Sequence, residues 1–124
     1  MPSIVPTRAH WVYSHRVQIP EISTGELAEI INAGQDVSLI DVREPDEFDT
    51  LRALGAVLIP LGDIVERAGE LPDGPLHLIC GSGFRSMQAC EALAPLGHNV
   101  TNIAGGTKAW ANGGHPTATG SNAQ

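Results

Sequence analysis

One cysteine in this 124-residue chain lies where its sulfur can become a nucleophile. Cys80 follows the largely apolar run 76–79 and precedes a Gly-Ser-Gly turn, after which a helix is predicted to begin near Phe84. The N–H groups of such a turn and of a helix N-terminus can converge on the residue before them. They favour a thiolate over a thiol, and the thiolate is the reactive form. The sequence therefore predicts a nucleophilic cysteine at position 80.

A structural interpretation of Cys80 competes with this one, because a lone cysteine is often a small buried hydrophobe. The two glycines of the turn, the helix start and the positive charge of Arg85 favour the reactive cysteine. The other cysteine, Cys90, shares an apolar helix face and is predicted to be part of the core. Ten positions apart across a helix, the two are poorly placed for a disulfide, and they form no zinc pattern.

Composition and charge restrict the class of protein. A chain of 124 residues suits one domain whose core needs neither metals nor disulfides. Lys and Arg number 7 against 14 Asp and Glu, a net charge of -7, which argues against nucleic acid and anionic membranes as partners. No membrane-spanning run is present, and residues 1–17 contain no secretory apolar segment, so we expect a cytoplasmic protein.

Strands and helices are predicted to alternate along the chain. Short apolar runs predict strands over 17–22 (at a sheet edge), 37–41, 56–59, 76–80 and 99–103. Helices are predicted from the capping box Ser23–Glu26 to Gly34, then over 44–48, 61–71, 86–93 and 107–111. This alternation predicts an α/β fold with a small, mainly parallel sheet flanked by helices. Sites in such folds form beyond the carboxyl ends of strands, where Asp41 and Cys80 both lie.

Three segments follow from this pattern: an N-terminal extension over 1–16, a domain over 17–116, and a disordered tail over 117–124. The extension contains Trp11 and Tyr13. We expect these aromatic side chains to cover the surface of their own domain, with packing on a second subunit as the alternative.

Four sequence blocks, in this order, resemble a single-domain rhodanese. They are Asp41–Phe48, Gly55–Leu61, Cys80-x-x-Gly83-x-Arg85-Ser86 and Gly105-Gly106-x-x-x-Trp110. Their order and spacing match that family over residues 20–116. The resemblance implies a rhodanese-like fold and a sulfurtransferase whose cysteine, here Cys80, cycles through a persulfide.

The resemblance also implies how the site is built, without cofactor or metal. The residues expected to surround the transferred sulfur with N–H groups and bind substrate are Gly81, Ser82, Gly83, Phe84, Arg85 and Ser86. Arg85 would bind an anionic sulfur donor, while Asp41 and Arg43 would form a structural ion pair nearby. The expected partners are a small anionic donor such as thiosulfate and a thiol, cyanide or protein acceptor. Arg52 and Leu54 depart from the family's usual histidine and proline, which leaves that loop's conformation open.

Alternative functions remain at this point. Cysteine phosphatases and arsenate reductases of the same fold have five residues between cysteine and arginine, whereas four separate Cys80 from Arg85. Non-catalytic binding modules of the family typically lack the loop cysteine, whereas Cys80 is present here and leaves open a sulfur-delivery role with a protein as acceptor. As sulfur donor, 3-mercaptopyruvate is the alternative to thiosulfate, because the neutral Gly81 and Ser82 resemble mercaptopyruvate sulfurtransferases while Arg85 resembles the thiosulfate enzymes.

Overall fold

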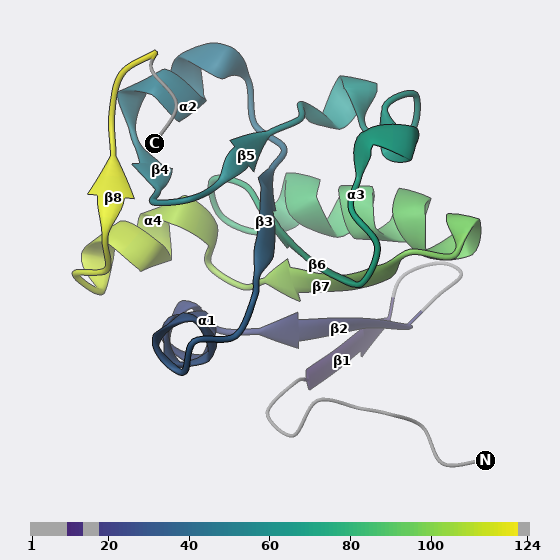
Figure 1. Cartoon of the computed structure of the whole chain (residues 1–124), viewed down its shortest axis with the longest axis horizontal. Coiled ribbons are helices and arrows are strands. Elements are labelled where there is room, and N and C mark those ends of the chain that lie inside the picture. The colour runs from purple at the N-terminus through teal and green to yellow at the C-terminus, as the bar shows by residue number, and fades with distance from the viewer. Residues whose placement is uncertain (1–9, 14–17, 122–124) are drawn as a thin grey trace.

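A six-stranded sheet forms the centre of the protein in the computed structural model, which describes residues 10–13 and 18–121. Its strands lie in the order β1-β2-β7-β6-β3-β5, and all neighbouring pairs except β1 and β2 are parallel (Figure 1). Their bounds are β1 His10–Tyr13, β2 Gln18–Ile22, β3 Ser38–Asp41, β5 Val57–Leu58, β6 Pro75–Ile79 and β7 Asn99–Ile103. The prediction of an α/β fold with a mainly parallel sheet is confirmed.

Helices and short 3-10 turns connect the strands. The helices are α1 Thr24–Asn32, α2 Pro45–Thr50, α3 Phe84–Leu93 and α4 Gly106–Asn112, and the 3-10 turns are η1 Leu61–Asp63, η2 Ala68–Glu70 and η3 Ala94–Leu96. The predicted capping box begins α1, because Ser23 Oγ accepts from the Glu26 N–H at 3.1 Å while the Glu26 carboxylate accepts from the Ser23 N–H at 2.9 Å.

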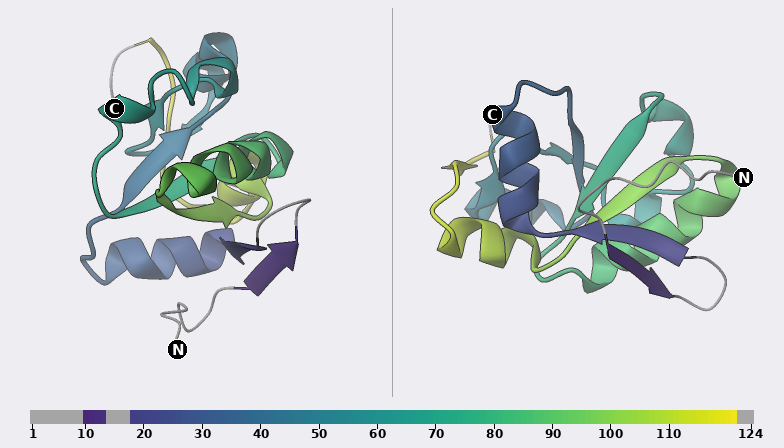
Figure 2. Two further views of the ribbon diagram at one scale, coloured as in Figure 1. Left: turned by 90° about the vertical axis from the view of Figure 1, so that its right-hand side faces the viewer. Right: turned by 90° about the horizontal axis from the view of Figure 1, so that it is seen from below.

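Helices cover both faces of the sheet, as the turned views show (Figure 2). On one face α3 and the 3-10 turns pack over Ile40 and Leu78. On the other face α1 and α4 pack over Leu39 and Ile79. Successive side chains of a strand point to opposite faces, so burial on both faces explains why these strands are continuous apolar runs.

The prediction of one helix over 61–71 is wrong. The structure has two separate 3-10 turns there, η1 and η2. Gly62 and Gly69 weaken a helix, and the β-branched pair Ile64 and Val65 adds a further cost. Ile64 is nevertheless buried. The apolar pattern therefore identified a core residue correctly but did not predict the backbone conformation around it.

The prediction of an edge strand at 17–22 is also wrong among the described residues. Strand β1 pairs antiparallel with β2, placing Trp11 opposite Pro20 and leaving β2 between β1 and β7. The expected extension over 1–16 therefore contributes a strand to the sheet. The side chains of Trp11 and Tyr13 lie outside what the structure describes, so both interpretations of them stay predictions.

The tail over 117–124 is not disordered where the structure describes it. Thr117–Ala118 forms strand β8, which pairs antiparallel with β4 (Arg52–Ala53) (Figure 1). Arg52 is 1% exposed, its guanidinium lies 4.5 Å from the Phe48 ring centroid, and its Nη1 donates to Phe48 O and Gly120 O at 3.1 and 2.7 Å. A buried guanidinium needs acceptors, and the C-terminal backbone provides one of them. Residues 122–124 lie outside the described part.

Candidate active site

The predicted nucleophile lies at the carboxyl end of a central strand. Cys80 directly follows β6, and Asp41 ends the neighbouring strand β3, where it pairs in register with Ile79 (Figure 1). The structure therefore brings Asp41 and Cys80 to one edge of the sheet, the edge at which sites of α/β folds form.

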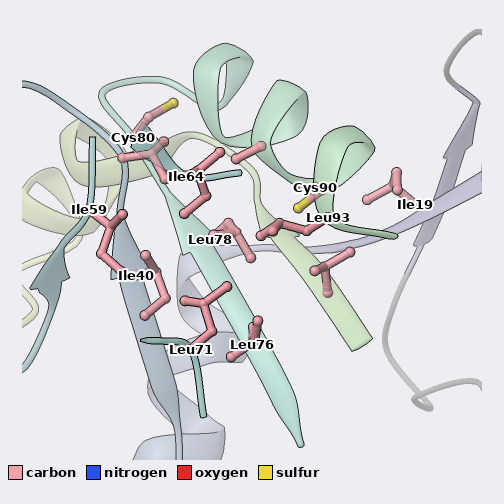
Figure 3. Close-up of a cluster of buried hydrophobic side chains, with 13 residues drawn as sticks. Ile19, Ile40, Ile59, Ile64, Leu71, Leu76, Leu78, Cys80, Cys90 and Leu93 are labelled. Carbon is pink, nitrogen blue, oxygen red and sulfur yellow. The ribbon is translucent and has the colours of Figure 1, made fainter. Parts of the chain in front are cut away.

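The loop after β6 folds back over the cysteine sulfur. Gly83 N donates to Cys80 Sγ at 3.0 Å, and Ser86 Oγ donates to the same sulfur at 3.2 Å. Gly83 precedes α3 with a φ of 114°, which a residue with a side chain rarely adopts. Cys80 is only 1% exposed, but its sulfur points toward the beginning of α3 at the loop end of the apolar cluster (Figure 3).

These contacts change the acidity of the thiol. Burial raises the pKa of Cys80, but hydrogen bonds from the Ser86 hydroxyl and from the N–H groups of Ser86, Gly83 and Ser82 outweigh it. The net result is a pKa below the ordinary value of a cysteine thiol. Such a thiolate can attack an electrophilic atom and form a covalent intermediate.

Contacts from α4 and β7 occupy three carbonyl oxygens of the loop. Thr107 N donates to Cys80 O at 2.8 Å and Lys108 N donates to Gly81 O at 3.1 Å. On the other side, Asn102 Nδ2 donates to Gly83 O at 3.3 Å. With these carbonyls engaged elsewhere, the groups directed at the sulfur are hydrogen-bond donors, which suits an anion.

Gly106 allows α4 to approach the loop this closely. Its φ is 59°, and a Cβ there would lie 2.5 Å from Cys80 O and 2.6 Å from Gly81 O. From the sequence, the Gly105-Gly106 pair predicts only a turn. Neither the support that it gives to the cysteine loop nor the contact of Asn102 has a local sequence signal.

Arg85 is held by a carboxylate from another helix. Its Nη1 and Nη2 donate to Glu47 Oε1 and Oε2 at 2.6 and 2.9 Å. This contact lowers the pKa of Glu47 to about 2, although burial opposes the shift. Glu47 was not among the predicted site residues, and the only signal for it was its place in the Asp41–Phe48 block.

Asp41 and Arg43 form a buried ion pair. Arg43 Nε and Nη2 donate to Asp41 Oδ1 and Oδ2 at 3.0 and 2.9 Å, and Nη2 also donates to Leu51 O at 2.6 Å. Both side chains are at most 7% exposed. The pair therefore connects the end of β3 to the far end of α2.

Two pockets border the cysteine loop. One, of about 290 Å³, lies against Ser82, Gly83, Phe84 and Met87. The other, of about 420 Å³, lies between α2 and α4 and is bordered by Asp46, Glu47, Gly81 and Lys108. Phe84 is 82% exposed at the rim of the loop, an unusual environment for a large apolar side chain.

Other groups with possible chemistry lie away from the loop. Cys90 is fully buried in α3, and burial raises the pKa of its thiol. His77 is buried in β6, and burial lowers its pKa. Over residues 10–13 and 18–121, no three His, Cys, Asp or Glu side chains form a group that could hold a metal ion. In the same ranges no helix has the length and apolar character to cross a membrane.

Comparison with protein families and known proteins agrees with this geometry. The model of the rhodanese-like domain matches residues 23–113. YtwF of Bacillus subtilis is 42% identical over 95 residues, which cover 76% of this chain and 92% of YtwF. A sulfurtransferase of Allochromatium vinosum is 36% identical, covering 79% of this chain and 94% of its own. The thiosulfate sulfurtransferase PspE of Escherichia coli is 38% identical over 56% of this chain and 69% of PspE.

Solved structures show the same fold. A rhodanese-related protein of Thermoplasma volcanium superposes with a TM-score of 0.72 at 32% sequence identity. The match covers 79% of this chain and 96% of that protein. The similarity thus extends over nearly the whole of a small protein.

Proposed function

This chain belongs to the rhodanese-like domain family and is a sulfurtransferase, and from this premise we propose that Cys80 carries the transferred sulfur as a persulfide. In the first step the Cys80 thiolate attacks the outer sulfur of thiosulfate. The S–S bond of thiosulfate breaks, and sulfite leaves with the bonding electron pair. In the second step cyanide or a thiolate attacks the outer sulfur of the persulfide, which releases thiocyanate or a new persulfide and restores the Cys80 thiolate.

One observation carries this proposal: the Cys80 sulfur accepts hydrogen bonds from Gly83 N and Ser86 Oγ in a loop in which the carbonyl oxygens of Cys80, Gly81 and Gly83 are engaged elsewhere. Both the starting thiolate and the persulfide anion need donors of this kind. Covalent transfer divides one difficult displacement into two easier ones. The same donors serve both steps.

We propose thiosulfate as the sulfur donor and 3-mercaptopyruvate as the alternative. The name of PspE, a thiosulfate sulfurtransferase, supports the first. The neutral Gly81 and Ser82 next to Cys80 support the second, because they add no positive charge to attract a dianion. The acceptor in this proposal is cyanide or a small thiol. A protein thiol is the alternative, supported by the exposed aromatic ring of Phe84 beside the loop.

The proposal also includes a reducing, cytoplasmic location. Among the residues that the structure describes, Cys80 and Cys90 are both free thiols. A persulfide-forming cysteine requires its thiolate, and reducing compartments keep such thiols from forming disulfides.

Steady-state rates with thiosulfate and with 3-mercaptopyruvate, using cyanide as acceptor, test the proposal. Mass spectrometry of protein treated with each donor should show one added sulfur atom on the peptide that contains Cys80. Cys80→Ser should lose the adduct and the turnover with both donors, whereas Cys90→Ser serves as the matched control and should keep both. Wild-type protein that gains no sulfur at Cys80, or that hydrolyses an aryl phosphate faster than it transfers sulfur, would contradict the proposal.

A further inference from the structure

The only charged side chain of the cysteine loop is already neutralised by a partner. Apart from Cys80 itself, positions 80 to 86 of the sequence contain a single side chain that is charged at neutral pH, the guanidinium of Arg85. Both terminal nitrogens of that guanidinium donate to the two oxygens of Glu47, at 2.6 and 2.9 Å. This is the bidentate geometry that makes an arginine–carboxylate pair strong.

Glu47 is held in place independently of Arg85. Its Oε1 also accepts from the Glu44 N–H at 3.0 Å, in the capping box that begins α2. The N-terminal end of that helix favours a carboxylate. Because the pKa of Glu47 lies at about 2, the carboxylate stays ionised at any pH at which a thiolate forms. Arg85 therefore meets a fixed negative charge.

The pocket beside this pair has a mixed charge. Lys108 borders it from α4, while Asp46 and Glu47 border it from α2. Arg43 also borders the pocket, but its guanidinium is paired with Asp41. An approaching anion therefore meets two acidic side chains, of which Glu47 is paired with Arg85, and one lysine. Coulomb repulsion grows in proportion to the charge of the anion, so a dianion is penalised about twice as strongly as a monoanion.

We infer that Glu47 tunes the charge selectivity for the sulfur donor, by positioning Arg85 and offsetting its charge so that a dianion such as thiosulfate gains less over a singly charged donor than an unpaired arginine would give it. The inference rests on the proposed sulfurtransfer by Cys80 and specifies its substrate class. Glu47 touches Arg85 and not the sulfur, so it is a positioning residue and not a catalytic one.

Glu47→Gln tests this inference, because glutamine has nearly the same shape and its carbonyl oxygen can still accept from the Glu44 N–H. We expect kcat/KM to rise about tenfold for the dianion thiosulfate and about threefold for the monoanion 3-mercaptopyruvate, mainly through lower KM values. The gain for thiosulfate should shrink as ionic strength rises. Glu47→Asp keeps the charge and should keep a donor ratio near that of the wild type.

Two matched controls separate a local effect from general acidity. Asp46→Asn removes one charge from the adjacent position in the same pocket, where no contact with Arg85 is present, and should change the donor ratio by less than about twofold. Glu70→Gln removes the carboxylate of a similar bidentate pair with Arg67 elsewhere on the surface and should leave the ratio unchanged.

Three results would overturn the inference. They are a Glu47→Gln variant that loses activity equally with both donors, an Asp46→Asn variant with the same gain, and a Glu47→Asp variant that behaves like Glu47→Gln. Wild-type protein that takes up no sulfur at Cys80 from any donor would instead contradict the proposed function. Wild-type loading together with an unchanged donor ratio in a folded Glu47→Gln variant would contradict only the role of Glu47.

Discussion

The two cysteines, Cys80 and Cys90, lie ten positions apart in contrasting environments. Cys80 is 1% exposed and Cys90 0%, and both belong to the same apolar cluster against α3 (Figure 3). Yet the pKa of Cys80 is lowered while that of Cys90 is raised. Burial pushes both upward, so the difference comes from the hydrogen-bond donors that surround only Cys80.

The comparison shows that burial alone does not decide whether a thiol is reactive. Cys90 lies within α3, where the helix uses its own N–H groups, and its side chain belongs to the apolar cluster that includes Leu93 and Ile19 (Figure 3). Cys80 lies before α3, where the first N–H groups of a helix have no partner within the helix. A distance of ten residues therefore separates a thiol surrounded by hydrogen-bond donors from a core side chain.

Alkylation rates give the largest expected difference. At neutral pH we expect Cys80 to react with iodoacetamide at least about a thousandfold faster than Cys90, because the pKa of Cys80 is lowered while that of Cys90 is raised. Peptide mapping after timed exposure measures both rates in one sample. In denaturant the rates should converge. Equal rates in the folded protein would remove the contrast on which the site rests.

A methyl group at position 106 should disturb the loop that surrounds Cys80 and leave the environment of Cys90 unchanged. Gly106→Ala would force a Cβ to within 2.6 Å of the carbonyl oxygens of Cys80 and Gly81, so the loop must shift. A shift of that size should lower sulfurtransfer by about a hundredfold. Gly97→Ala is the control: its φ of 95° gives similar strain, but nothing lies within 4 Å of the new Cβ. If Gly97→Ala lowers activity as much, backbone strain and not the collision is responsible.

Removing the Ser86 hydroxyl should reduce the difference between the pKa values of Cys80 and Cys90. Ser86→Ala deletes the hydrogen bond to Cys80 Sγ, and we expect the pKa of Cys80 to rise by about one unit, which corresponds to a hydrogen bond to a charged group of about 1.4 kcal/mol. The pH profile of alkylation at Cys80 measures the shift. The profile of Cys90 should not change. A Cys80 profile that stays in place would mean that the backbone N–H groups alone stabilise the thiolate.

Stability should depend on pH with opposite slopes for the two thiols. The folded-state pKa of Cys80 is lowered, so its contribution to the free energy of unfolding is complete above the unfolded value of about 8.5 and is lost as pH falls through the folded value. The folded-state pKa of Cys90 is raised, so stability is lost as pH rises above about 8.5.

Urea unfolding of the wild type and of Cys90→Ala at several pH values tests these slopes. Between pH values of about 8.5 and 9.5, the wild type should lose about 1 kcal/mol relative to Cys90→Ala. Just below a pH of about 8.5, the free energy of unfolding of the wild type should rise with pH because of Cys80, and Cys80→Ser should show a smaller rise. Parallel curves for the wild type and Cys90→Ala would show that Cys90 ionises freely in the folded state.

The sequence predicted the features that depend on neighbours along the chain. The strand before Cys80, the turn after it and the capping box of Ser23 and Glu26 all lie within a few residues, and the structure has all three. Alternating apolar runs and helical patterns were enough for the α/β fold. Local propensity and hydrophobic pattern agree in these segments, which is why they could be predicted.

Features that depend on distant contacts could not be predicted in this way. The pairing of Arg85 with Glu47 joins side chains separated by 38 positions. Strand β8 forms because β4 lies beside it, although Thr117 and Ala118 have no strand pattern of their own. Two 3-10 turns stand over 61–70 where a helix was predicted. Ile64 is buried in the apolar cluster there although the backbone around it is not an α-helix. Tertiary contacts override weak local preferences in each case.

The antiparallel pairing of β4 with β8 ties the end of the chain to the helix that supplies Glu47. Gly120 N donates to Asp49 O at 2.6 Å, and Arg52 donates to Gly120 O, so α2 is fastened at its C-terminal side by residues from the last part of the sequence. A truncation or an affinity tag placed directly after Ala118 would remove the hydrogen bonds that Gly120 makes with Asp49 O and with Arg52. On the inferred role of Glu47, a change of the chain directly after Ala118 should therefore shift the donor preference at Cys80, a residue 38 positions away in sequence.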